Sequence, residues 1–248
     1  MDKKESLQNK NIELKNDIEY LKNEIIKLKK ENINLKEDIK EIKKILEPIN
    51  NKFKEGLNIN RYIFNNKSVI MKDDEFSLIN MAIKSRLNKE IKELKKLYQA
   101  TIDGDGALNF HSKCDNIPNT LVLIKSAGNR RFGGFTTQTW ESIGPYGYYK
   151  DDKYAFLFSL DKQKIYPYMK KGNAICCYKD YGPIFGYTIN GNAIKIENNS
   201  IQEKGLYTTE SFPNSSYNFN GDNNALSEDG KCCRIYAAEY EVFQVIFY

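Results

Sequence analysis

A histidine and a cysteine lie three residues apart in the segment ALNFHSKCDN. They are His111, the only histidine of the 248-residue chain, and Cys114, which Asp115 follows directly. On a helix, residues three apart share a face, so the imidazole could activate the thiol as a nucleophile or a redox sensor. Such a pair also needs an orienting group and an oxyanion site, and the sequence identifies neither.

Packing is the competing interpretation of the same segment. Leu108 and Phe110 precede the histidine, and cysteine is among the residue types most often buried in proteins. We therefore interpret His111 and Cys114 as packing residues with local hydrogen bonds. A thiol-based redox sensor or enzyme that uses Cys114 with His111 remains the alternative function, and no other catalytic residue is assigned.

The sequence predicts no metal site and no cofactor. One histidine cannot supply a histidine cluster, and the five cysteines include no C-x-x-C pair. The segment DGDG fails as a calcium loop because Thr101 and Ser112 occupy positions that need acidic ligands. GNRRFGGF, residues 128–135, lacks the Lys-Ser/Thr of a P-loop, so Gly133 and Gly134 indicate a bulge or a close backbone approach in a sheet.

Charge and hydropathy exclude two kinds of partner. The chain has 38 basic and 33 acidic residues, and they are interspersed rather than gathered in a basic patch that would favour nucleic acid. No apolar run approaches the roughly 18–20 residues of a membrane span, and the charged N-terminus has no signal-peptide core. We expect a soluble, cytoplasmic protein that binds no nucleic acid and does not insert into membranes.

Residues 1–47 carry a seven-residue apolar repeat. Its d row reads Leu7, Leu14, Leu21, Leu28, Leu35 and Ile42, and its a row reads Lys4, Asn11, Ile18, Ile25, Asn32, Ile39 and Leu46. Isoleucine at a with leucine at d favours a parallel two-stranded coiled coil. Asn32 would satisfy its amide only against a partner asparagine, which fixes the register and the two-chain state. Whether the second chain is a copy of this one or another protein stays open.

The flanking charges agree with a parallel pair. Each g residue meets the following e residue of the partner, which gives Asp17–Lys22, Glu24–Lys29, Glu31–Lys36 and Asp38–Lys43. These four pairs are of opposite sign and favour a parallel orientation. One further pair, Lys10–Lys15, is repulsive and would weaken the first heptad. Pro48 should end the helix because it removes a helical hydrogen bond, and residues 48–67 should form a linker.

The remaining residues, 68–248, should form one globular domain. Apolar spacings of three and four predict helix over 73–100, capped by Asp73 or Asp74, with a break near Leu87 and Asn88. A short helix over 107–114 would be capped by Asp105.

Beyond Thr120 the pattern becomes that of strands. About nine short strands follow, with hairpins around AGN and DKQK, and the Asn- and Ser-rich residues 197–230 read as a long surface loop. In YAFLFSL both faces are apolar, so that strand needs a layer above and below it. The predicted fold class is α+β, mainly β: a helix-flanked antiparallel two-sheet β-sandwich preceded by a long coiled-coil helix.

Five segments of the domain resemble the TLDc (TLD) family. In order they are LYQATIDGDGALNFHSKCDNIPNTLVLIKS, RRFGGFTTQTW, YKDDKYAFLFSL, YGPIFG and YEVFQV. The resemblance covers residues from about 68 to 248 and implies a helix-flanked β-sandwich without an established catalytic site. It further implies a role in protection against oxidative stress and binding of the vacuolar proton pump, the V-ATPase. Through that partner the protein would lie at the periphery of acidic organelles.

Overall fold

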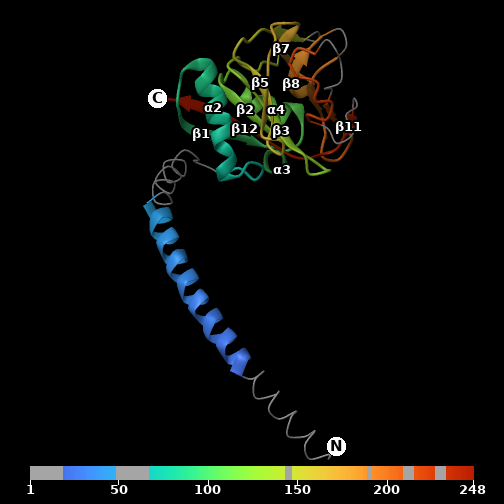
Figure 1. Ribbon diagram of the computed structural model, residues 1–248. Coiled ribbons are helices and arrows are strands. Elements are labelled where there is room, and N and C mark those ends of the chain that lie inside the picture. The colour runs from blue at the N-terminus through green and yellow to red at the C-terminus, as the bar shows by residue number, and fades with distance from the viewer. Residues whose placement is uncertain (1–18, 49–66, 143–146, 189–190, 209–214, 227–232) are drawn as a thin grey trace, which may run out of the picture. The chain divides into compact units, whose positions relative to one another are not determined.

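The computed structural model describes residues 19–48, 67–142, 147–188, 191–208, 215–226 and 233–248. The chain divides into two compact units, Met1–Gly56 and Leu57–Tyr248 (Figure 1). The candidate dimerisation residues Leu7, Leu14 and Ile18 lie outside the described residues, as does nearly all of the expected linker.

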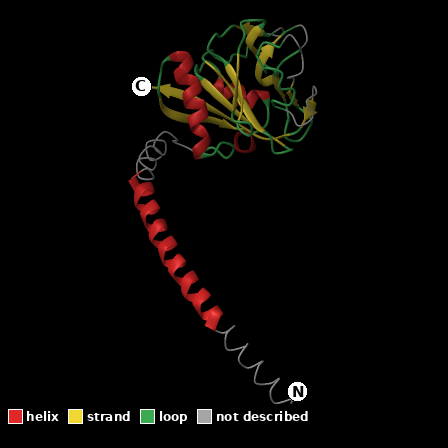
Figure 2. Cartoon of the chain, viewed as in Figure 1, coloured by secondary structure: helices red, strands yellow, loops and turns green. Residues whose placement is uncertain are grey.

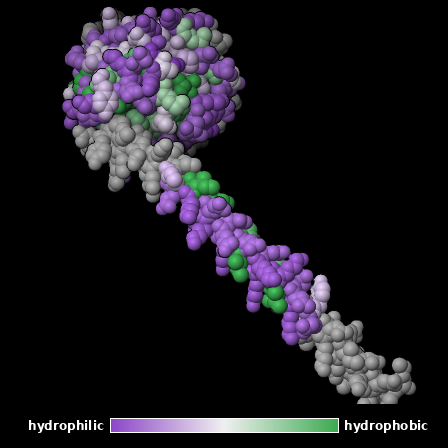
Figure 3. All heavy atoms as spheres, turned by 60° about the vertical axis from the view of Figure 1, so that its left-hand side comes forward, coloured by the Kyte–Doolittle hydropathy of each residue, from purple (hydrophilic) through white to green (hydrophobic). Residues whose placement is uncertain are grey.

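The first unit contains one continuous helix over residues 19–48. Its apolar side chains stay in contact with solvent and form isolated patches on an otherwise hydrophilic surface (Figure 3). Leu21, Ile25, Leu28 and Ile39 are each more than half exposed, between 51% and 57%. The helix therefore has no apolar core of its own.

The second unit is a pair of antiparallel sheets, drawn as yellow strands in Figure 2. The first sheet has the order β1-β12-β2-β3-β5-β6, formed by β1 (Ile91–Gln99), β12 (Ala237–Phe247), β2 (Thr120–Ser126), β3 (Arg131–Thr136), β5 (Phe156–Ser159) and β6 (Lys164–Pro167). The second has the order β11-β10-β9-β8-β7-β4, formed by β11 (Cys233–Ile235), β10 (Leu206–Thr208), β9 (Ile194–Glu197), β8 (Tyr181–Tyr187), β7 (Asn173–Cys177) and β4 (Tyr148–Lys150). The predicted hairpins around AGN and DKQK are β2–β3 and β5–β6.

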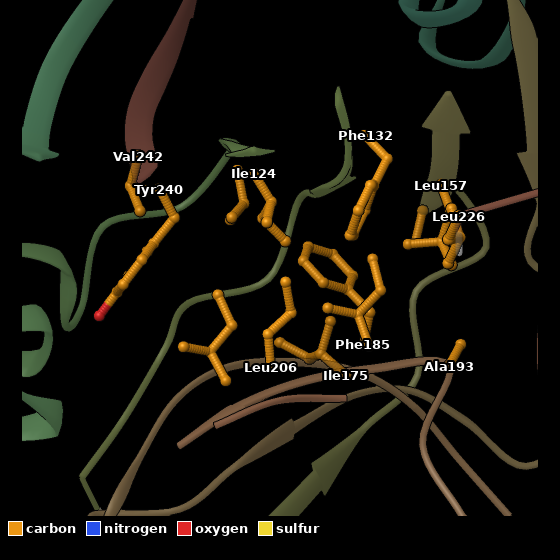
Figure 4. Close-up of a cluster of buried hydrophobic side chains, with 14 of the residues drawn as sticks. Ile124, Phe132, Leu157, Ile175, Phe185, Ala193, Leu206, Leu226, Tyr240 and Val242 are labelled. Carbon is orange, nitrogen blue, oxygen red and sulfur yellow. The ribbon is translucent and has the colours of Figure 1, made fainter. Parts of the chain in front are cut away.

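The inner faces of the two sheets enclose the larger core. Ile124, Phe132 and Leu157 from the first sheet meet Ile175 and Phe185 from the second (Figure 4). All are fully buried, which is why the strands that carry them are rich in aromatic and branched residues. The predicted two-sheet sandwich is confirmed.

A smaller core lies on the outer face of the first sheet. The short helix η1 (Asp73–Glu75) leads into α2 (Phe76–Leu87), which lies over the first sheet (Figure 1). In this core, Phe76, Ile79 and Ile83 of α2 pack with Phe135 and Phe243 of the sheet. The sequence expectation that β5 is covered on both faces is confirmed by membership of its residues in both cores. The helix-flanked architecture is confirmed with it.

Gly133 in β3 is required by close backbone approach. A Cβ atom there would lie 1.9 Å from the carbonyl oxygen of Val122 in β2, and one at Gly134 would lie 2.7 Å from the Phe185 ring. The β2–β3 register has no shift over Lys125 to Thr120, so the glycines mark close approach and not a bulge.

The prediction that residues 91–99 are helical is wrong. Residues 91–99 form β1, while Ala100 begins the short helix α3 (Ala100–Asp103) and is helical as predicted. β1 pairs with β12 through register shifts between Ile91 and Glu93 and between Lys96 and Tyr98. The first shift places Ile91 and Leu94 on the same outer face, and the second turns Tyr98 toward the inner core. Buried residues therefore recur at spacings of three and four on a strand, which is the spacing typical of a helix.

The prediction of a surface loop over residues 197–230 is also wrong in its described parts. The segment contains β10, and beyond it Tyr217, Phe219 and Leu226 are buried in the inner core. Asp222 fastens this stretch to the β5–β6 hairpin by contacts with Lys162, Lys164 and Tyr166. A polar composition thus conceals three large buried side chains.

The predicted helix caps are wrong as well. Asp105 binds Ser200 and the backbone N–H of Ile201, while the side chain of Asn198 accepts from the N–H of Ala107 at the start of the short helix. At the earlier helix, Glu75 reaches back to the N–H of Lys72, and neither Asp73 nor Asp74 serves as the cap. Both caps use partners that spacing alone does not identify.

Candidate functional site

The short helix α4 (Ala107–Cys114) carries His111 and Cys114, as predicted. It packs against β1 of the first sheet and β8 of the second. Its fully buried Phe110 lies edge-on to Tyr98 and Trp140, with ring centroids 6.0 and 5.7 Å apart. The helix is therefore a fixed support at which both sheets meet.

Both ring nitrogens of His111 face oxygen atoms. Nδ1 lies 2.6 Å from Oδ1 of Asp115, the residue that caps the C-terminus of α4. Nε2 lies 2.8 Å from the carbonyl oxygen of Tyr178, in the turn between β7 and β8, and 3.0 Å from that of Tyr181, the first residue of β8. Neither nitrogen is directed at the sulfur of Cys114.

The pKa of His111 reflects two opposed causes. Burial lowers it, but the hydrogen bond to Asp115, the backbone carbonyls and the charge of Asp115 together outweigh burial and raise the pKa above 6.5. The imidazolium is also placed in the last turn of α4, where a positive charge is favoured by the helix dipole. The arrangement favours a structural cation, whereas a general base needs a free nitrogen.

The surroundings of Cys114 disfavour nucleophilic chemistry at its thiol. Its side chain is fully buried, and burial raises the pKa of the thiol. The negative charge of Asp115 acts in the same direction. A reactive cysteine needs a lowered pKa and access to solvent. The structure thus brings His111, Cys114 and Asp115 together in one helix without forming a nucleophile–base pair.

Cys176 and Cys177 are also buried and free. Cys177 belongs to the inner core, and its neighbour Cys176 faces the opposite side of β7. Among the residues that the structure describes, no three histidine, cysteine, aspartate or glutamate side chains gather closely enough to hold a metal ion.

Sequence reasoning missed a cluster of tyrosines on the outer face of the second sheet. We call it the tyrosine surface, made of Tyr149, Tyr178, Tyr181, Tyr187 and Tyr207. Tyr149 and Tyr187 have ring centroids 4.3 Å apart, and the Lys195 ammonium lies 5.0 Å from the Tyr181 ring and 4.2 Å from the Tyr207 ring. The 17 tyrosines beside one tryptophan were the available signal.

The described dimerisation residues form the second candidate site. They are Leu21, Ile25, Leu28, Asn32, Leu35, Ile39 and Ile42, and all are exposed along the 19–48 helix. Burying one leucine or isoleucine side chain contributes about 1.5–3 kcal/mol. A partner that covered this row would therefore gain substantial binding free energy.

The chain thus combines a β-sandwich, which has a cluster of tyrosines on one face, with a separate helix that has an exposed apolar row. The model of the TLDc domain family matches residues 64–246, which covers both sheets and the helices between them. The chain belongs to the TLDc family. A search of curated proteins found no match. Within the described residues, no helix is long and apolar enough to cross a membrane.

Proposed function

We propose that this chain is a non-enzymatic TLDc protein-interaction module held as a parallel homodimer by its N-terminal coiled coil. Its role would be protection against oxidative stress, through binding and regulation of the V-ATPase. The module would act in the cytoplasm and reach acidic organelles through that partner. The observation that carries the proposal is the match to the TLDc family over residues 64–246, joined to a helix with an unsatisfied apolar row.

The charges beside the apolar row favour a second copy of this chain as its partner. In a parallel homodimer, Glu24 meets Lys29, and the two following pairs repeat the same signs. In an antiparallel dimer, acidic g positions would face each other and lysine e positions would do the same. Each exposed pair contributes only about 0.2–1 kcal/mol. The charges therefore set the orientation, while the apolar row supplies the affinity.

Two linked domains give the proposed binding its strength. Once one domain of a dimer has engaged a V-ATPase assembly, the second is held near any equivalent site. Such tethering can raise overall affinity by roughly 10²–10⁴-fold without a new contact. Weak domain–partner binding would then suffice for stable association.

The test is a pull-down of V-ATPase subunits with the full chain as bait. The control is a chain without residues 68–248, which keeps the helix and removes the domain. Enrichment over this control supports the proposal. Equal enrichment from residues 1–47 alone would assign binding to the coil and leave the domain passive, and no enrichment would contradict V-ATPase binding.

The non-enzymatic part has its own test in the reactivity of Cys114. Thiol labelling of the folded chain should be slow and should not titrate below about pH 8, because an unperturbed thiol has a pKa near 8.5 and burial raises this one. The control is the same chain in denaturant, where labelling should be fast. Rapid labelling of folded Cys114 at neutral pH would favour the thiol-based alternative.

A further inference from the structure

Only the protonated imidazole of His111 satisfies both of its ring nitrogens. Nδ1 faces the carboxylate of Asp115 at 2.6 Å, and Nε2 faces the carbonyl oxygens of Tyr178 and Tyr181 at 2.8 and 3.0 Å. These oxygens can only accept hydrogen bonds, whereas a neutral imidazole has one N–H and one lone pair. Either neutral tautomer would therefore direct a lone pair at an acceptor.

The two sides of the ring differ in how firmly they are held. Asp115 follows on the same helix: its N–H donates to the carbonyl of His111 at 3.1 Å, and its backbone forms a bridge with Trp140. The other side is the turn between β7 and β8, where Lys179 and Asp180 are exposed. The N–H of a neutral ring would stay on the charged carboxylate, so loss of the proton would break the contacts to the turn.

The turn and the first residue of β8 contribute Tyr178 and Tyr181 to the tyrosine surface. The Tyr178 ring lies edge-on to Tyr149 and to Tyr181, with centroids 6.5 and 5.6 Å apart, and its hydroxyl lies 3.3 Å from that of Tyr149. Lys195 lies over the Tyr181 ring. The positions of these rings therefore depend on the turn that His111 holds.

We propose that His111 acts as a pH switch. Its imidazolium holds the β7–β8 turn against α4 and fixes the tyrosine surface, and its deprotonation releases the turn. The device requires neither a partner nor a V-ATPase role, so it stands apart from the proposed function. It gives the sandwich a response to pH in the neutral range, where histidine is the side chain that normally titrates.

The charged groups around the pair leave Asp115 as the principal counter-charge. On the turn, the Lys179 ammonium pairs with Asp180 at 2.9 Å, so those two charges offset each other. Beyond Asp115, Glu141 is paired with Lys150, and Cys177 is buried with a raised pKa and stays uncharged. Tyr178 and Tyr181 face the ring through backbone carbonyls.

The direction of the pH effect follows from the raised pKa of His111 in the folded chain. The contribution of the imidazolium to stability is complete below the ordinary imidazole pKa of about 6.5. It is lost as pH rises through the higher pKa of the folded state. Raising the pH should therefore break the contacts between His111 and the turn, and acidification should restore them.

The experiment uses the full chain, whose single histidine gives one imidazole signal in an NMR titration. That signal should titrate above 6.5, with both nitrogens protonated at low pH. Hydrogen-exchange protection factors of amides near Tyr178 to Tyr181, corrected for intrinsic exchange, should fall over the same pH range. The fall should reach as much as about tenfold for each unit by which the pKa is raised. A titration at or below 6.5, or unchanged protection across it, would overturn the proposal.

Matched carboxylate variants separate the contribution of the His111–Asp115 contact from general charge effects. Asp115→Asn should lower the imidazole pKa toward its ordinary value and move the loss of protection to lower pH. Asp180→Asn removes a carboxylate of the turn that is not bonded to His111. It should leave the imidazole pKa and the pH at which protection is lost nearly unchanged. His111→Gln should make the protection independent of pH. An equal shift from both aspartate variants would contradict the role of Asp115, and the titration of the unmodified chain decides the proposal even where a variant fails to fold.

Discussion

The sandwich encloses its apolar residues, whereas the 19–48 helix leaves its apolar residues exposed. In the sandwich, Phe132, Phe185 and Phe158 are fully enclosed by the same chain, in two cores on either side of the first sheet. Along the helix, Leu28 and its heptad neighbours remain more than half exposed. The sandwich is therefore complete by itself, and under the proposed function a partner chain completes the helix.

The largest expected effect tests the proposed pairing of the 19–48 helix. Leu28→Asp places a charge at a d position of the proposed seam, and the dimer should dissociate in sedimentation equilibrium. The matched control is Ile26→Asp, because Ile26 is similarly exposed, 53% against 55%, but lies at position b outside the seam. Equal loss of the dimer in both variants would contradict the heptad assignment.

The next effect tests the self-sufficient unit. Phe185→Ala removes a ring that packs 5.4 Å from Trp140, and the free energy of unfolding should fall by about 3–5 kcal/mol. Urea unfolding followed by the fluorescence of the single tryptophan measures it. Leu108→Ala, at a residue 82% exposed, should change the same free energy by less than about 0.5 kcal/mol. Loss of the dimer in Phe185→Ala would show that the two units are not separate.

A smaller effect is expected at the tie that closes the sandwich. Burial acts to raise the pKa of Asp222, but hydrogen bonds from Lys162, Lys164 and Tyr166 outweigh it and lower the pKa to about 2. The stabilisation is present above the unfolded value of 3.8 and is lost as pH falls through about 2. Asp222→Asn should cost about 2 kcal/mol at neutral pH. Denaturant unfolding at pH 7 and pH 2 should show a difference between variant and parent only at pH 7.

The smallest effect concerns specificity of the helix pair. Asn32→Ile should raise the thermal stability of the coil, because an apolar side chain replaces an amide that the proposed dimer would bury. It should also remove the preference for two chains in register, which sedimentation would detect as larger assemblies. A variant that melts at a lower temperature than the parent would place Asn32 outside the seam.

The fold was largely predictable from short apolar runs such as β2, β3 and β5. These strands carry apolar residues on both faces, so each needs a layer on either side. The error at β1 has a physical cause: two bulges convert a strand pattern into helix spacing at Ile91, Leu94 and Tyr98. The buried Tyr217 and Phe219 were missed since their neighbours are polar and their partners are distant in sequence.

The candidate site was predictable in part. Residue types placed His111 and Cys114 on one short helix, and α4 confirms that placement. The partners of His111 could not be predicted, because two of them are backbone carbonyls about seventy residues away, which no side-chain pattern encodes. The tyrosine surface was missed for a related reason: it is assembled from four strands or turns that meet only in the folded sheet.

The place of β12 in the first sheet has a consequence for synthesis. Among the described strands, β1 has β12 as its only neighbour in that sheet, and about 140 residues separate the two strands. A growing chain on the ribosome can form the β2–β3 hairpin early, but β1 must wait until residues 237–247 have emerged. Until then the backbone groups that β1 pairs with β12 are open to other nascent chains, so a premature stop within β12 would expose a strand and not merely shorten the protein.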